Sequence, residues 1–362
     1  MRQRPRRSAA LSSFAVGVRL LRLMLLWPLL LCPRLALAAD VSGAARLQLS
    51  TGLDTNPGRD FGDAATPDAM ASLSGQLQGQ LRQDAFFLEG SYELGGRAFA
   101  TSSAADLWVQ AARASASWAP WTALTFGVEG RAKDRHAGSR GRGYADLVGG
   151  PFVAARPSKT LSFELHADAH RFLYRDAYAY SFGAGELSLL AHFQPTRRQG
   201  FSLSLLAADE RYATQAVGFS GDELGVRRDD HRVGGAVQYR YRGPFALAVG
   251  YGFQSVGSNS FGEAQRSHRF TASVGLRLPQ RLMLFVEGAL QLTQYPDGVY
   301  LSPQILLLED DENLSSATAR LVRPLNAHLD VELRYSLYQT ALPQNGLHYL
   351  RQLATAGATF RF

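Results

Sequence analysis

The sequence predicts an all-β fold, a closed antiparallel transmembrane β-barrel of about sixteen strands in an up-and-down meander. Three observations predict it. Segment after segment alternates apolar and polar residues with period two, which indicates strands with different surroundings on their two faces. The connections between these segments alternate between short and long. Aromatic residues gather at the ends of the apolar faces, beside the short connections.

The chain begins with a segment unlike the rest. It is rich in arginine, and its apolar stretch, Leu23–Leu31, is far shorter than the ~20 residues that a membrane-spanning helix needs. Ala36, Leu37 and Ala38 then fit the small-x-small pattern of a signal cleavage site. We therefore predict a secretory signal peptide over residues 1–38 and a barrel domain over residues 39–362, so that Cys32, the only cysteine, leaves with the signal peptide.

The formal charge of +7 comes from this leader. Seven of the 38 basic residues lie within it and no acidic residue does, so the remaining 31 basic residues balance the 31 acidic ones. The basic isoelectric point therefore does not indicate nucleic-acid binding. With at most one cysteine, the chain also excludes a disulfide-stapled fold and a cysteine-ligated metal site.

The strands follow from the period-two pattern, of which Ala71–Arg82 is the clearest example. Its apolar face carries Leu73, Leu77 and Leu81, and its other face carries serine, glutamine and arginine. Taken in order along the chain, the same pattern predicts strands at residues 43–53, 70–82, 86–98, 107–119, 124–133, 144–155, 160–173, 182–194, 201–212, 231–242, 245–254, 268–278, 282–293, 314–323, 327–338 and 349–362.

The connections alternate in length. Short ones follow the even-numbered strands, and most contain or adjoin a proline, which cannot donate to a strand ladder. Longer ones follow the odd-numbered strands and include residues 54–68, 134–143, 213–230, 255–267 and 294–313. A meander of hairpins with short turns at one end of the barrel and longer loops at the other is typical of an outer-membrane β-barrel.

The polar faces of the strands indicate whether the apolar faces contact lipid or pack inside a soluble protein. Glutamine, glutamate, arginine and histidine run along their whole length, which is too polar for the inside of a sandwich. Closing the sheet removes its edges, and closure is required in hydrocarbon because no water satisfies unpaired amides. The mature length gives about twenty residues per strand and loop for sixteen strands, with fourteen strands as the alternative.

The chain ends in Phe360, Arg361 and Phe362, an alternating run with a terminal phenylalanine. In this it resembles the Gram-negative outer-membrane β-barrel proteins. That resemblance implies a location in the cell outer membrane and recognition of Phe362 by the barrel-assembly machinery. The residues from Gly52 to Pro57 (GLDTNP) also resemble the opening of several β-barrel porin families, some of them associated with export of polysaccharides or surface lipoproteins. The same residues also make ordinary turns.

The polar face of a sixteen-stranded barrel would surround a lumen wide enough for water. Acids and bases are both frequent on it, which predicts no strong ion selectivity; it suits either a field across an open pore or ion pairs that fill a closed one. No residue is predicted to be catalytic, cofactor-binding or metal-binding. The candidates for the pore lining are Glu89, Glu93, Arg113, Glu129, Arg131, Lys133, Glu164, His166, Asp168, His170, Arg232, Arg240, Glu287, Arg320, Glu332 and Arg334.

Seven of these candidates, on the strands predicted at 124–133 and 160–173, are expected to share one wall. The expected function is a passive porin-like pore for small polar solutes. The alternatives are an export barrel for polysaccharide or another polymer, an occluded structural or adhesive barrel, and, less favoured, an outer-membrane hydrolase using His166 and Asp168. The expected partners are outer-membrane lipid and lipopolysaccharide, and no nucleic acid. If the basic segment 133–142 faces outward, it either meets lipid phosphates or draws anions toward the mouth; the alternative is an ordinary solvated loop. The acidic run after Val299–Leu308 leaves the role of that connection open.

Overall fold

The computed structural model describes residues 40–58, 65–138, 143–175, 178–294, 296, 315–342 and 347–362. The predicted signal peptide lies outside the described residues, and so does nearly all of the predicted connection 294–313. Within the described ranges no helix is long and apolar enough to cross a bilayer.

The described residues form sixteen long strands and three single turns of 3₁₀ helix. The strands are β1 (Asp40–Asp54), β2 (Asp68–Gln83), β3 (Phe86–Phe99), β4 (Leu107–Trp121), β5 (Leu124–Ala137), β6 (Tyr144–Ala155), β7 (Leu161–Tyr174), β8 (Phe182–Phe193), β9 (Gln199–Val217), β10 (Glu223–Arg242), β11 (Phe245–Ser258), β12 (Gln265–Arg277), β13 (Met283–Gln294), β14 (Ser315–Pro324), β15 (Leu329–Leu342) and β16 (Leu347–Arg361).

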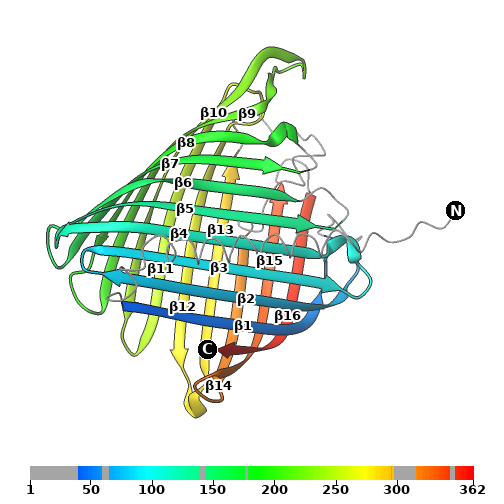
Figure 1. The fold of residues 1–362 in the computed structure, drawn as a ribbon. Helices are drawn as coiled ribbons and strands as arrows, with labels where there is room; N and C mark the ends of the chain where they lie inside the picture. The colour runs from blue at the N-terminus through cyan, green and yellow to red at the C-terminus, as the bar shows by residue number, and fades with distance from the viewer. Residues whose placement is uncertain are drawn as a thin grey trace, which may run out of the picture.

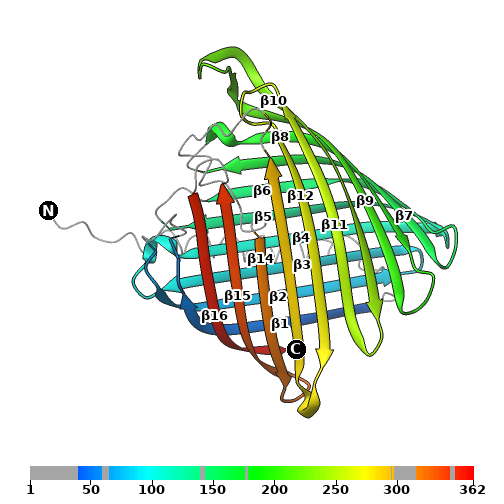
Figure 2. The same ribbon diagram turned by 180° about the vertical axis from the view of Figure 1, so that it is seen from behind.

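Each strand pairs with its neighbours in the sequence, and β1 pairs with β16, so the sheet closes into a barrel. Figures 1 and 2 show the continuous wall from the two sides. The last residue takes part in the closure, since the amide of Phe362 donates to the carbonyl of Ala45 at 2.9 Å and the amide of Ala45 donates back at 3.1 Å. The structure thus confirms the closed meander and sixteen strands rather than fourteen.

The two rims of the barrel differ as predicted. At one rim the connections are tight, such as residues 84–85, 122–123 and 243–244, and the C-terminus lies at this rim beside the start of β1. Longer connections, such as residues 100–106, lie at the opposite rim. We call these the short-turn rim and the loop rim.

The prediction of a long loop over residues 213–230 was wrong. β9 continues to Val217 and β10 begins at Glu223, so the two strands form a hairpin that extends past its neighbours at the loop rim (Figure 1). The alternation of apolar residues fades there because both faces of the extension are outside the lipid. The backbone pairing nevertheless continues, with Arg227 opposite Gln215 and Glu223 opposite Val217.

The outer face of the barrel is apolar. On β9, Phe201, Leu203 and Leu205 are 46%, 40% and 45% exposed, and the serines between them point the opposite way. The same alternation places exposed leucine, valine and phenylalanine side chains on the outside of nearly every strand. An exposed apolar surface that encircles the molecule is stable only against lipid, so the barrel spans a membrane.

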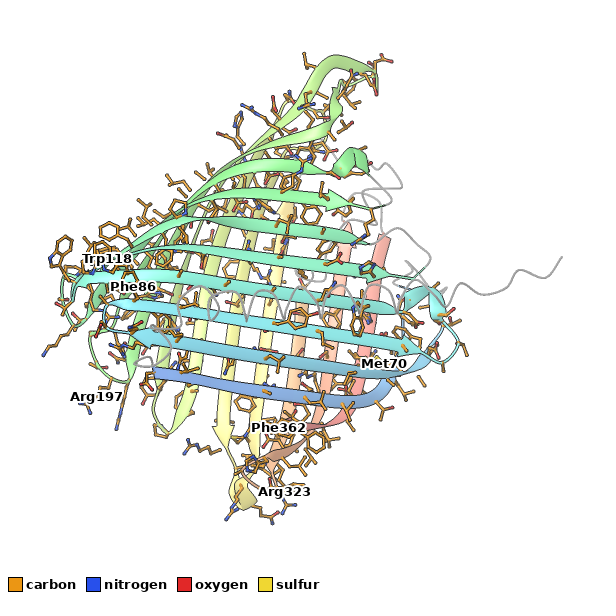
Figure 3. All side chains as sticks on the ribbon, viewed as in Figure 1. Met70, Phe86, Trp118, Arg197, Arg323 and Phe362 are labelled. Atoms are coloured by element: carbon orange, nitrogen blue, oxygen red, sulfur yellow. The ribbon has the colours of Figure 1, made fainter. Side chains whose placement is uncertain are left out.

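An aromatic girdle follows the outer face at the short-turn rim. Phe86 and Trp118 lie together there with ring centroids 6.4 Å apart (Figure 3), Phe193 faces Phe201 at 6.2 Å, and Tyr241 faces Phe245 at 5.3 Å. Amphipathic rings at this level match the boundary between hydrocarbon and head groups.

Polar groups limit the apolar band toward the loop rim. β5 continues to Ala137, beyond its predicted end, and its outward-facing Asp134 accepts hydrogen bonds from Arg175 at 2.5 Å and Gln110 at 3.3 Å. His136 lies 2.9 Å from the same carboxylate. The register of β5 turns Lys133 to the inner face, the side expected of a pore-lining candidate, so this residue does not belong to an outward basic loop.

Candidate functional site

All the candidate pore-lining residues lie on the inner face. Residues that pair across neighbouring strands point to the same side of the sheet, so the registers carry the assignment of inner and outer faces around the whole barrel. The exposed apolar side chains lie on the outside and these polar side chains on the inside. This holds for Glu89, Glu93, Arg113, Glu129, Arg131, Lys133, Glu164, His166, Asp168, His170, Arg232, Arg240, Glu287, Arg320, Glu332 and Arg334.

One group of contacts joins β4, β5 and β7. Arg113 donates to Glu129 at 2.8 Å, and the His166 ring lies 3.4 Å from Glu129 and 3.5 Å from Glu164. β6 lies between β5 and β7, and the contact across it is possible because Gly150 faces Glu129 there. A side chain at Gly150 would collide with the backbone carbonyl of Ala167, so only glycine fits at this point.

His170 belongs to a second group nearer the loop rim. Its two ring nitrogens lie 2.7 Å from Asp146 and 2.6 Å from Glu186, and its side chain is 9% exposed. Glu186 also accepts a hydrogen bond from Arg232 at 3.1 Å, and Arg232 pairs with Glu210 at 2.7 Å. A row of alternating charges thus runs across five strands, from β6 to β10, with each ion held by neighbours of opposite charge.

The structure therefore divides the cluster that the sequence predicted on two strands. Glu129, Glu164 and His166 form one group and His170 is in another, while Asp168, between them, has one buried carboxylate oxygen with no hydrogen-bond partner. Asp146 was not among the predicted residues, because the segment around it is rich in glycine and alternates only weakly. Side chains alternate between the two faces of a strand, and in the strand from Tyr144 to Ala155 the even-numbered residues face inward. The position of Asp146 in that alternation was the available signal.

Aromatic rings line the inner face just above this row. Tyr144, Phe172, Phe182 and Tyr212 come from four successive strands, with neighbouring ring centroids 4.9, 5.4 and 5.1 Å apart. The rings pack against one another across the strands, which stiffens the wall at the loop rim.

Arg228 ends the aromatic series on β10. Its guanidinium lies 4.0 Å from the centroid of the Tyr212 ring and pairs with Asp230 at 2.6 Å and Glu263 at 3.0 Å. Burial raises the pKa of Glu263, in the connection from β11 to β12, although the charge of Arg228 opposes the shift. Asp230 also accepts a hydrogen bond from Ser258 at 2.5 Å, so these contacts fasten the β9–β10 hairpin to β11.

The seam where the barrel closes has its own buried pair. Arg351 on β16 donates two hydrogen bonds to Asp54 on β1, from Nη2 at 2.5 Å and from Nε at 2.9 Å, and both side chains are almost fully buried. Farther along the seam toward the short-turn rim, Gln48 and Arg334 both donate to Glu332, at 2.7 and 3.3 Å. Paired charges of this kind fix the register between the first and last strands.

The arrangement offers no assembled catalytic or metal centre among the described residues. No three histidine, cysteine, aspartate or glutamate side chains in those ranges are placed to hold a metal ion. The inward histidines of β7 contact carboxylates, not a serine or another nucleophile. What these residues can do is line a wet surface with fixed charges.

Solved structures of similar shape are outer-membrane proteins at low identity. A bacterial polysaccharide outer membrane secretin is 11% identical, over 88% of this chain and 98% of its own, with a TM-score of 0.47. A loop-deletion mutant of OmpT, an outer membrane protein of Vibrio cholerae, is 9% identical over 90% of this chain and 100% of its own, with a TM-score of 0.49. OccAB3 of Acinetobacter baumannii is 10% identical over 89% of this chain and 100% of its own, with a TM-score of 0.47.

No protein-family model matches the sequence, and no curated protein is similar to it. Identities and TM-scores this low say nothing about the solutes or partners of this chain. Its closed sheet of sixteen antiparallel strands with an apolar outer face is nevertheless the architecture of bacterial outer-membrane barrels.

Proposed function

We propose that this barrel is a passive pore of a Gram-negative outer membrane that admits small polar solutes. One observation carries the proposal: the inner face of the closed sixteen-stranded sheet carries polar and charged side chains in both halves of the lumen. A barrel of this size leaves room for water inside. Arg46, Arg82 and Glu287 point inward and are exposed, which is the state expected of side chains in a wet lumen.

The mixture of charges on the wall suits solutes of either sign. β5, β7 and β15 each carry both acidic and basic candidates on the inner face, so the lumen presents both signs of charge to a solute. Such a lining lowers the cost of removing a solute from bulk water without holding the solute tightly.

The proposal also covers how the protein reaches and inserts into the outer membrane. Export would use the predicted signal peptide, and assembly would use the last strand, in which Phe360 pairs with Leu47 on the apolar outer face. Phe362 is 75% exposed at the short-turn rim, where an assembly factor could reach it. Lipid and lipopolysaccharide would surround the apolar band.

We propose no catalytic activity. The hydrolase alternative relied on His166 and Asp168, and His166 contacts two glutamates while it stacks on Phe152 with ring centroids 5.3 Å apart. These contacts place carboxylates and an aromatic ring, rather than a serine or another nucleophile, against the imidazole. Loss of a hydrolytic activity in His166→Ala would contradict this.

Conductance of the purified protein in planar lipid bilayers tests the pore. Because the only cysteine of the chain lies in the predicted signal peptide, single cysteines can be placed at will. On β12, Ser273→Cys faces the lumen and Val274→Cys, its neighbour, faces lipid. A charged methanethiosulfonate reagent should change the step conductance of Ser273→Cys and leave that of Val274→Cys unchanged.

The result also separates the alternatives. Absence of step conductance, with the barrel folded, would favour an occluded structural or adhesive barrel. A conductance far larger than expected for a pore that admits only small solutes, together with retention of oligosaccharide, would favour polymer export. An equal response of both cysteine variants would contradict the assignment of inner and outer faces.

A further inference from the structure

The inner wall from β10 to β14 carries charges that are not paired with one another. Arg240, Arg320 and Glu287 all point into the lumen in the half nearer the short-turn rim. Within the described ranges, none of the three side chains makes a hydrogen bond or an ion pair. A wall charge that is not neutralised by a neighbour is available to a solute.

These three residues surround a groove of about 240 Å³. The registers place Arg240, Ala248, Ser273, Glu287 and Thr318 in one row across five strands. The next row toward the short-turn rim contains Ala246, Gly275, Phe285 and Arg320 in neighbouring strands. The small residues on β11 and β12 form the floor, and the longer side chains rise on either side of them.

The two arginines line the groove from strands on opposite sides of this floor. Strands β10 and β14 are four strand spacings apart, an arc of about 19 Å. The guanidinium of Arg320 lies 4.8 Å from the centroid of the Phe285 ring, which shows that its side chain leans from β14 toward the floor. Arg240 lines the same groove from the β10 side, so one small solute in the groove can approach both guanidinium groups.

Glu287 determines which solute fits. Its exposed carboxylate lies in the row of Arg240, on β13, between the strands of the two arginines. A simple anion between the arginines would be repelled by it, whereas a cationic group on the same solute would be attracted. The groove therefore offers two donors for a carboxylate and one acceptor for an ammonium group.

We propose that this groove binds small zwitterions of the amino-acid type, with the carboxylate held by Arg240 and Arg320 and the ammonium group held by Glu287. The inference rests on the proposed function, because it names the solute class of the pore. Binding itself does not require a lumen that is open from end to end, since the groove lies in the half of the lumen nearer the short-turn rim.

Ligand-observed NMR on the full-length barrel in detergent tests the site, with glycine, acetate and methylammonium as probes. Glycine should bind, and Arg240→Gln/Arg320→Gln should weaken it about tenfold or more because two charge-assisted hydrogen bonds are lost. Glu287→Gln should weaken glycine and strengthen acetate. This opposite response of two probes identifies the carboxylate as the ammonium partner.

A matched control removes the same charge elsewhere in the lumen. Arg46 and Arg82 are inward-facing and exposed near the short-turn rim, on β1 and β2. Arg46→Gln/Arg82→Gln should leave glycine binding unchanged. An equal loss in this control, or no glycine binding to the folded wild-type barrel, would overturn the proposal. If the barrel binds glycine with this specificity but shows no conductance, the binding site would be supported and the proposed pore function would be contradicted.

Discussion

Two walls of the same lumen differ in how their charges are satisfied. From β6 to β10, near the loop rim, His170, Glu186 and Arg232 each contact partners of opposite charge. From β10 to β14, near the short-turn rim, Arg240 and Glu287 have no such partner among the described residues. We infer that the paired wall stiffens the barrel and that the unpaired wall meets the solute, since a charge that is already neutralised offers little to a passing molecule.

The largest expected effect comes from breaking the paired wall at Arg228. In Arg228→Gln, Asp230, which is 1% exposed, loses its bidentate partner, and Glu263 loses its own. A buried charge left without its partner costs about 3–5 kcal/mol. Urea unfolding of the barrel in lipid or detergent should show this loss.

The matched variant in the unpaired wall is Arg240→Gln. It should change the free energy of unfolding by less than about 0.5 kcal/mol, as surface substitutions usually do. Equal losses in Arg228→Gln and Arg240→Gln would mean that the two walls do not differ in the way described.

A smaller effect is expected from Glu186→Gln. The glutamine keeps the shape of the side chain but removes the charge that contacts both His170 and Arg232. Removing one partner of a buried hydrogen bond to a charged group costs about 1–3 kcal/mol. The same unfolding measurement should show it, with Glu287→Gln as the neutral control; a larger loss in the control would reverse the assignment of the two walls.

The smallest effect concerns pH. Burial holds the pKa of Glu263 in the folded barrel above its unfolded value. The stabilisation from its protonation is therefore complete below the unfolded pKa and is lost as the pH rises through the folded pKa. Hydrogen exchange in the β9–β10 hairpin, corrected for the intrinsic rate, should accordingly be slower at acidic than at neutral pH.

Glu263→Gln is the control for this dependence. Glutamine resembles the protonated glutamate and does not titrate, so the variant should show less change in protection between acidic and neutral pH than the wild type. A dependence that is unchanged in Glu263→Gln would assign the effect to other groups.

Much of the barrel could be predicted because lipid and water impose a simple code on a strand. Leu203 and Leu205 had to face one way and Ser202 and Ser204 the other, whatever strands lie beside them. The ends of β9 and β10 could not be predicted in this way. Outside the lipid both faces of a strand meet water, so residues 213–217 and 223–230 lose the alternation while they keep their backbone pairing.

The sequence by itself determined which side chains face lipid and which face the lumen, because a period of two repeats along each strand without reference to any other. Only the tertiary structure decided which inward charges meet. The contacts of His170 with Asp146 and Glu186 depend on the registers of β6, β7 and β8, and a shift of two residues in any of them would preserve the alternation while changing every partner. The unpaired state of Arg240 and Glu287 depends in the same way on the small residues that the register places between them.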